Sequence, residues 1–244
     1  MDEIGFHRAM HRPGTLVDVG AHNGKLTLPF ASLPDSSVIA FEPLPTAFAR
    51  LEANLRAAFG GAVPPHVTLR REALGSAAGE LTLSVPWVGG DAIEEWASVV
   101  KDFAALQRHD SQISRVDQYT VPVTTLDSLG LTDVTAMKVD AEGSEEAVLR
   151  GAEATLRRCL PVLTVELEER HQAGGTRDVP AWLAGLGYQG FFTVGGAWHP
   201  LAAFDAATMQ QAGTTPGAPA TSDPYVYVFA FVAGDRIGTL PPLR

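Results

Sequence analysis

The sequence has 244 residues, of which 45% are hydrophobic and 19% charged, proportions that are ordinary for a soluble globular α/β domain. Its formal net charge of −10, without a Lys/Arg-rich run, argues against a nucleic-acid partner, because an acidic surface repels phosphate backbones. The start Met1-Asp2-Glu3 leads into no apolar signal-peptide core, no apolar run approaches the roughly 20 residues of a membrane helix, and Cys159 is the only cysteine. We therefore expect a cytoplasmic protein with no membrane partner.

Strand-like and helix-like patterns alternate through the first 75 residues. Short apolar runs predict strands over 15–19, 37–41 and 67–71. Helices are expected over 23–33, where Pro29 is tolerated only near the first turn, and over 46–59. In the second of these, Phe48, Leu51, Leu55 and Phe59 recur at helical spacing.

The pattern then changes to alternating residues. Residues 80–85 predict a strand that pairs with a second strand over 121–125. Between them lies an insertion at about 86–119, which carries Trp87, Trp96, Phe103 and His109. Trp87, Trp96 and Phe103 either stack on a substrate or form a small core of the insertion.

The alternation returns in the second half, with strands over 134–139 and 160–167 and helices over 144–156 and 179–186. Strands over 188–194 and 225–232 follow, and no helical pattern separates them, which favours antiparallel pairing. The whole pattern predicts a mostly parallel sheet covered by helices on both faces. We expect one domain over 1–244, with the insertion and a variable Gly/Pro/Ala-rich loop at about 197–223 that overhangs the site.

The loop over 18–24 follows the first strand and reads Asp-Val-Gly-Ala-His-Asn-Gly. Gly20 and Gly24 allow a sharp turn and a close approach to a ligand, and Asn23 is a candidate helix cap. Glu42 ends the second strand, where an acid accepts hydrogen bonds from ribose hydroxyls. His22 stands where the dinucleotide fingerprint requires glycine, so the pattern disfavours a dinucleotide site.

A second acidic turn, Asp140-Ala141-Glu142-Gly143, follows the strand over 134–139. Residues at the carboxyl ends of parallel strands line the ligand crevice, so we expect Asp140 to point into it. Glu142 lies near the start of a helix, where a negative charge is stabilised.

These segments together resemble the FkbM family of S-adenosylmethionine (SAM)-dependent methyltransferases. The resemblance covers about residues 14–170 and rests on the glycine loop, on Phe41-Glu42-Pro43 and on the "V-x-x-x-T-L-D" step over 121–127. Its most specific part is the run Met137-Lys138-Val139-Asp140-Ala141-Glu142-Gly143-Ser144-Glu145, followed by Val148-Leu149-Arg150-Gly151-Ala152-Glu153. The resemblance implies a Rossmann-like class I fold with a mostly parallel seven-stranded sheet, an antiparallel last strand and helices on both faces.

The resemblance also implies roles for residues of the cofactor site. The backbone over 20–24 would cradle the methionine part of SAM, and Asp18 would either support that loop or hold the amino group through water. Glu42 would bind the ribose, the next strand end would lie beside the adenine, and Asp140 would sit near the methionine amino group and the transferred methyl group. The residues so assigned are Asp18, Gly20, Ala21, His22, Asn23, Gly24, Glu42, Pro43, Glu72, Ala73, Leu74, Asp140 and Glu142. A looser correspondence concerns Ser98, which follows Trp96 and Ala97 in the insertion.

Members of this family mostly methylate hydroxyl oxygens, so the resemblance implies O-methylation of a sugar or secondary-metabolite-type small molecule. A base would assist such an acceptor; Asp140 is the first candidate and His109 the second. We favour a site without a metal, because the sequence has no tight His/Cys cluster, over a Mg²⁺ ion held by Asp140 and Glu166.

Three questions stay open at this stage. An NAD(P)-dependent oxidoreductase and a non-catalytic SAM-binding module are the alternative functions. Nothing identifies the acceptor, although Trp198 and the earlier aromatic residues are candidates to contact it. The sequence does not specify an oligomeric state, and a homodimer is compatible with it.

Overall fold

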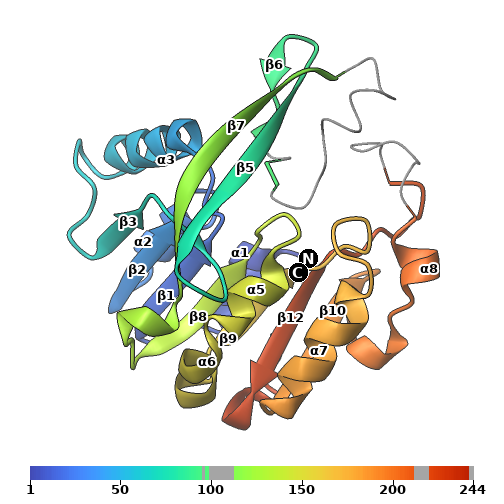
Figure 1. The fold of residues 1–244 in the computed structure, drawn as a ribbon. Helices are drawn as coiled ribbons and strands as arrows, with labels where there is room; N and C mark the ends of the chain where they lie inside the picture. Colours follow the sequence, from blue (N-terminus) through green and yellow to red (C-terminus); the bar gives the residue numbers. More distant parts are fainter. Residues whose placement is uncertain (95–96, 99–112, 212–219, 242–244) are drawn as a thin grey trace.

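The computed structural model describes residues 1–94, 97–98, 113–211 and 220–241. Its centre is an eight-stranded sheet in the order β11-β10-β12-β9-β8-β1-β2-β3 (Figure 1). In that order the strands are β11 (Ala197–Pro200), β10 (Tyr188–Val194), β12 (Val228–Ala233), β9 (Val162–Glu166), β8 (Val134–Val139), β1 (Gly14–Val19), β2 (Ser36–Phe41) and β3 (Val67–Arg70).

The strands from β3 to β9 are parallel, and β12 runs antiparallel to both β9 and β10. This confirms the mostly parallel sheet and the antiparallel pairing of the last two predicted strands. The sheet has eight strands rather than seven because β10 turns back into the short β11 through Gly195 and Gly196. Both glycines have positive φ, as a tight hairpin turn requires.

Helices cover both faces of this sheet, because successive side chains of a strand point to opposite sides. Leu16 of β1 belongs to the core under α1 (Glu3–Ala9), α2 (Thr27–Ala31) and α3 (Pro45–Ala58). Val17, its neighbour, belongs to the core under α5 (Glu145–Arg150), α6 (Glu153–Cys159) and α7 (Gly175–Gly185). A further short helix, α8 (Ala206–Met209), precedes β12. No helix in the described part of the chain is long and apolar enough to cross a membrane.

A second, four-stranded sheet has the order β4-β7-β5-β6 and projects above α3 (Figure 1). Its strands are β4 (Ala73–Leu74), β7 (Ile113–Thr124), β5 (Gly79–Val88) and β6 (Asp91–Ala92). The register Leu81↔Val121 confirms the predicted pairing. The pairing continues to Val88 and Ile113, so both ends of the predicted insertion are strand rather than loop.

Two predicted helices differ from the structure. The helix expected over 144–156 is divided into α5 and α6: the Gly151 carbonyl oxygen accepts from the N–H of Asp127, and the N–H of Thr155 donates to the Asp127 carboxylate, so the helical hydrogen bond between residues 155 and 151 is replaced. Gly151 also lies against the backbone of Gly75, where a Cβ would come within 1.9 Å of the carbonyl oxygen. The helix expected from Asn23 begins at Thr27 with no side-chain cap, so the predicted cap is wrong. Pro29 lies in its first turn, as its ring requires.

The predicted Leu-Asp step proves to be structural. Leu126 is fully buried, and the Asp127 carboxylate accepts hydrogen bonds from the N–H groups of Ala154 (2.9 Å) and Thr155 (2.8 Å). Asp127 therefore satisfies the first N–H groups of α6, a helix with no cap of its own. This contact joins the end of the second sheet to the helical layer under β8.

Candidate functional site

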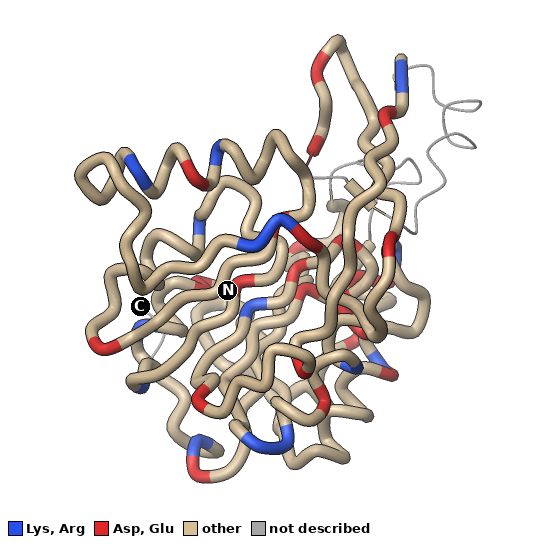
Figure 2. Tube along the Cα trace, turned by 60° about the vertical axis from the view of Figure 1, so that its left-hand side comes forward, with Lys and Arg blue, Asp and Glu red and all other residues tan. Residues whose placement is uncertain are grey.

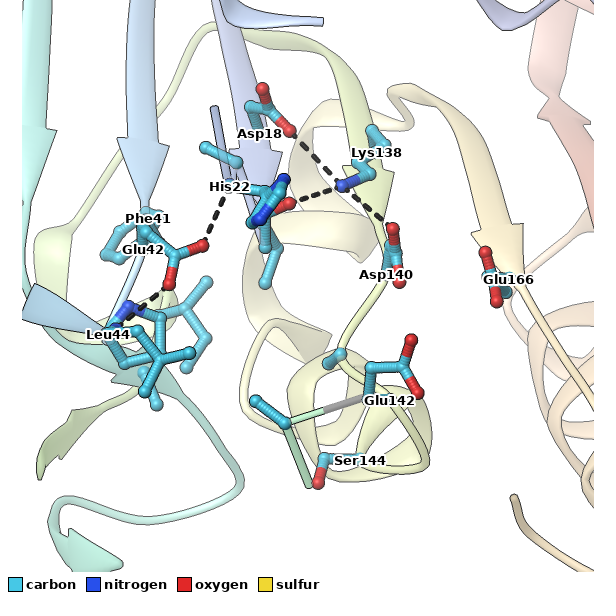
Figure 3. A pocket seen from close by; sticks show the side chains of 18 of the residues that line it. Asp18, His22, Phe41, Glu42, Leu44, Lys138, Asp140, Glu142, Ser144 and Glu166 are labelled. Carbon is cyan, nitrogen blue, oxygen red and sulfur yellow. Dashed lines mark hydrogen bonds and ion pairs between the residues drawn. The ribbon is translucent and has the colours of Figure 1, made fainter. Parts of the chain in front are cut away.

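A cavity of about 340 Å³ lies at the carboxyl ends of β1, β2, β8 and β9 (Figure 3). Ligands bind at this edge of open parallel sheets. The predicted site residues that line it are Asp18, Gly20, Ala21, His22, Asn23, Glu42, Pro43, Glu72, Ala73, Leu74, Asp140 and Glu142. Gly24 does not line the cavity, and His109 lies outside the described residues.

Glu42 is held rigidly at the end of β2. Its side chain is buried, and its two carboxylate oxygens accept hydrogen bonds from the N–H groups of His22 (2.8 Å) and Leu44 (2.9 Å). Burial raises the pKa of Glu42, which these two hydrogen bonds oppose. Each oxygen retains a second acceptor position, so the carboxylate can still receive hydrogen bonds from a ligand in the cavity.

Lys138 joins three segments of the site, a role that the sequence analysis missed. Its buried ammonium group donates to the carbonyl oxygen of Gly20 (2.6 Å) and forms ion pairs with Asp140 (3.3 Å) and Asp18 (3.6 Å) (Figure 3). Burial lowers the pKa of Lys138, but the carboxylates of Asp140 and Asp18 outweigh it and raise the pKa above its usual value. A lysine in a mostly apolar strand, two residues before an acid, is the sequence signal that could have pointed to it.

Asp18 supports the glycine loop, and both of its carboxylate oxygens contact other groups of the protein. It is fully buried, and its other oxygen accepts a hydrogen bond from the Thr27 hydroxyl (2.6 Å) at the start of α2. The same carboxylate therefore connects β1, α2 and Lys138. This fits the first of the two roles that the resemblance implies for Asp18.

The loop glycines are required by packing against protein. Gly20 has a φ of 71°, and a Cβ there would lie 1.9 Å from the carbonyl oxygen of Asp140. At Gly24, with a φ of 91°, a Cβ would meet the side chains of Leu28 and Leu51. These glycines thus allow the loop to pack closely against the end of β8 and against helices α2 and α3.

The turn after β8 is held by Glu145, whose carboxylate accepts from the N–H groups of Ala141 (2.8 Å) and Gly143 (3.1 Å). This stabilises the turn although Glu142 has a φ of 49°, in the left-handed region. Ser98 reaches the same turn from the insertion and donates to the Glu142 carbonyl oxygen (2.8 Å). The insertion is therefore fastened to the rim of the cavity.

The opposite rim is closed by Glu94, which follows β6 and lines the cavity. Its carboxylate pairs with Arg50 of α3 and lies 4.0 Å from the His22 imidazole. These contacts attach the second sheet to the glycine loop. His22 thus lies in the wall between the two sheets.

One side of the cavity, which we call the acidic wall, consists of Glu3, Asp140, Glu142 and Glu166, with Tyr227 beside them. Glu3 comes from α1 and Glu166 ends β9, so the wall combines distant parts of the chain. The sequence analysis named Glu166 only as a metal alternative and did not find Glu3 or Tyr227. Burial raises the pKa of Glu3 and of Tyr227.

The aromatic residues proposed to contact a substrate do not line the cavity where the structure describes them. The Trp87 indole donates to Asp117 (2.9 Å) on the second sheet, under the Arg115 guanidinium. Trp198 donates to the carbonyl oxygen of Pro241 (2.7 Å), away from the site. Trp96 and Phe103 lie outside the described residues. No described residue of 197–223 lines the cavity either, so the expectation that this loop overhangs it is wrong for that part.

The distribution of charged residues over the described chain, and around the cavity, is predominantly acidic. Figure 2 shows Lys and Arg scattered in short stretches, without a continuous basic run in the described segments. The cavity itself is lined by many carboxylates and by two lysines, Lys25 and Lys138. Such a site repels anionic ligands and attracts cationic ones.

Comparison with known proteins identifies a methyltransferase family. The chain matches the family described as Methyltransferase FkbM domain over residues 18–190. A search of curated proteins finds no significant match. Among solved structures, the chain is similar to a methyltransferase FkbM from Methylobacillus flagellatus KT, with 15% identity and a TM-score of 0.53. The similarity covers 94% of this chain and 50% of that one, so the chain spans about half the length of that neighbour.

Two further structures are similar at lower scores. One is an rRNA methylase from Streptococcus thermophilus, with 13% identity, a TM-score of 0.48, and coverage of 94% of this chain and 93% of that one. The other is an O-methyltransferase from Bacillus cereus in complex with SAH, with 11% identity, a TM-score of 0.44, and coverage of 90% and 74%. The M. flagellatus structure establishes a methyltransferase-like α/β fold with a mostly parallel sheet.

Proposed function

Because the chain belongs to the FkbM family of methyltransferases, we propose that it transfers a methyl group to a hydroxyl oxygen of a small sugar or secondary-metabolite-type molecule. The methyl donor is SAM. The observation that carries the proposal is the buried Glu42, fixed by the glycine loop at one end of a cavity whose other end is the acidic wall.

The residues present fit the donor. The Glu42 carboxylate has acceptor positions left for the two ribose hydroxyls, and Leu74 with Ala73 offers an apolar surface to the adenine. Asp140 lines the cavity beside the glycine loop, and in this proposal its carboxylate receives the ammonium group of the methionine part. When bound, SAM supplies an electrophilic methyl group on a sulfonium and a neutral leaving group.

The protein's own contribution is alignment and charge. Lys138 fixes the end of β8 against the glycine loop, so Asp140 and Gly20 keep a constant separation. Holding two reactants in line makes the transfer effectively unimolecular, which is the main advantage that an enzyme adds to such a displacement.

A hydroxyl-bearing acceptor suits the acidic wall. Carboxylates are hydrogen-bond acceptors, and hydroxyl groups donate to them, whereas a phosphate-rich acceptor would be repelled. Glu166 and Tyr227 lie on the β9 and β12 side of Asp140, away from Glu42. We assign that side to the acceptor because the donor residues occupy the side of β1 and β2.

The proposal is tested by calorimetry of the full chain with SAM, S-adenosylhomocysteine (SAH) and NADH. We expect micromolar binding of SAH and none of NADH, and Glu42→Ala should weaken SAM binding at least about tenfold, since it removes hydrogen bonds to a charged group. Glu80→Ala, an exposed change on β5, is the matched control and should bind as the wild type does. Failure of clean, folded protein to bind either SAM or SAH would refute the proposal.

The acceptor is sought separately, by incubating the protein with isotope-labelled SAM and small-molecule extracts. Label transferred to a stable ether supports O-methylation. Label found on nitrogen or carbon, or in nucleic acid, would refute that part of the proposal while leaving the donor assignment intact.

A further inference from the structure

Glu166 is the one member of the acidic wall whose carboxylate has no partner among the described residues. Asp140 pairs with Lys138 at 3.3 Å, and Glu142 faces the His171 imidazole at 3.6 Å. The carboxylate oxygens of Asp140, Glu142 and Glu166 nevertheless lie within 4.8 Å of one another. Glu166 therefore lines the cavity close to two acids without a cation of its own (Figure 3).

The described elements around Glu166 turn acids and phenols toward this region, together with His171 and Arg170. Both of these basic side chains are already paired with Glu168. Burial, and then the negative charges of Asp140 and Glu142, raise the pKa of Glu166 to about 10. The titratable groups that surround it are Asp140, Glu142 and Glu145 from the turn after β8, Glu168 and His171 after β9, Tyr225 and Tyr227 before β12, and Glu3 of α1. Lys138, the nearest buried cation, is already engaged by Asp140 and Asp18.

On the basis of the donor site proposed above, we propose that Glu166 is the general base of the reaction. Binding of the positively charged donor displaces the proton that Glu166 carries in the free protein. Glu166 holds a proton in the free protein. It releases that proton when the positively charged donor binds beside Asp140, and its carboxylate then receives the proton of the acceptor hydroxyl.

Protons, bonds and electrons are conserved over one reaction cycle. The acceptor oxygen loses its proton to Glu166 and forms the bond to the methyl carbon, while the carbon–sulfur bond breaks and its electron pair stays on sulfur. The products are the methyl ether, a neutral thioether and a protonated Glu166. Glu166 thus returns to the state it has in the free protein, and the thioether leaves without a proton being exchanged.

Glu166 suits this role better than Asp140, which the sequence analysis placed first. Asp140 is already engaged by the Lys138 ammonium group at 3.3 Å, a contact that holds the end of β8 against the glycine loop. A carboxylate without a cation, in a buried acidic setting, binds a proton more strongly, and general-base efficiency rises with basicity. Asp140 then holds the donor, and Glu166 takes the proton.

SAM and SAH provide a matched pair of probes, because they differ by the methyl group and its charge. Titrations of the full chain with each, at pH 8 in phosphate and in Tris, give the number of protons released from the dependence of the binding heat on the buffer. We expect a release approaching one proton for SAM and near zero for SAH. Between pH 6.5 and 8.5, the Kd for SAM should fall by up to about tenfold per pH unit, the limit for a one-proton linkage.

Glu166→Gln removes the titrating group and keeps its size. This variant should bind SAH with wild-type affinity, which shows that the site is folded, and should bind SAM with no proton release. Glu80→Gln, on the exposed face of β5, should keep the wild-type release.

Equal proton release for SAM and SAH, or release that survives in Glu166→Gln, would overturn the inference while leaving SAM as donor. Mg²⁺ that binds the wild type, is lost in Glu166→Gln and abolishes the release would also overturn it, because Glu166 would then hold a metal. If neither SAM nor SAH binds, the result counts against the proposed donor site rather than against the role of Glu166.

Discussion

Replacing Lys138 by methionine tests whether one buried cation holds the donor site together. Methionine keeps most of the chain length and volume but loses the ammonium group that faces Gly20, Asp18 and Asp140. Asp18 would be left fully buried next to no positive charge. Removing one partner of a buried ion pair costs about 3–5 kcal/mol, mostly because the remaining charge is uncompensated.

The magnitude depends mainly on Asp18. The Asp140 side chain is 35% exposed, so water can solvate it once Lys138 is gone, and its share stays within about 1 kcal/mol. The lost hydrogen bond to Gly20 overlaps with these terms, because all three involve the same ammonium group. We expect a loss of about 3–5 kcal/mol, which lowers the Tm of a chain of this size by about 6–20 °C.

The measurement is urea unfolding of the wild type, Lys138→Met, Asp18→Asn and the double variant. Asn at position 18 can keep the Thr27 contact without a charge, so the double variant should lose much less than the sum of the two single changes. SAH affinity of the single Lys138 variant should fall as well, because the glycine loop is no longer attached to β8. A loss below about 1 kcal/mol, or additive single changes, would refute the reasoning.

Three further changes probe the frame of the site. Gly20→Ala should cost at least about 1–3 kcal/mol in unfolding free energy, since the residue has positive φ and its Cβ would strike Asp140, whereas Gly79→Ala meets nothing and should be near neutral. Asp127→Ala removes the cap of α6 and should cost about 1 kcal/mol in urea unfolding without changing SAH affinity; an altered affinity would show that the cap also shapes the cavity. Glu166→Gln should raise the Tm of the free protein at pH 8. The folded carboxyl keeps a proton that the unfolded chain loses above about pH 4.5, so wild-type stability falls as pH rises toward 10. We expect a gain of about 1–3 kcal/mol at pH 8 and little at pH 5, discounted for the open side of the cavity; an equal gain at both pH values would contradict it.

The residues that line the cavity on the β1 and β2 side were predictable because the carboxyl ends of parallel strands meet at one edge of a sheet. Asp18 lies near the end of an apolar strand, and Glu42 and Asp140 each follow one, so their meeting follows from the alternation of strands and helices. The same logic placed Glu72, Ala73 and Leu74 at the cavity. Residues at strand ends can therefore be assigned to the cavity from the sequence without knowing which distant residues they contact.

Other features depend on distant contacts and were missed for that reason. The break at Gly151 involves contacts with Asp127, which is far away in the sequence, and periodicity alone predicted one continuous helix. Glu3 was considered only for its charge near the start of the chain, because the docking of α1 against β9 is not visible locally. One contact of this docking, His7 with Thr164 at 3.0 Å, joins residues with no recognisable motif.

The acidic wall also has a consequence for how relatives are sorted. The family match begins at residue 18 and ends at residue 190, whereas Glu3 and Tyr227, which line the cavity, lie outside these limits. A tree built from the matched region would group sequences by their shared donor chemistry. Relatives that keep the counterparts of Glu42 and Asp140 but diverge at both ends of the chain should divide into subgroups with different acceptors. Under the proposed assignment of the acidic wall to the acceptor, a classification by substrate has to compare the two ends of the chain together.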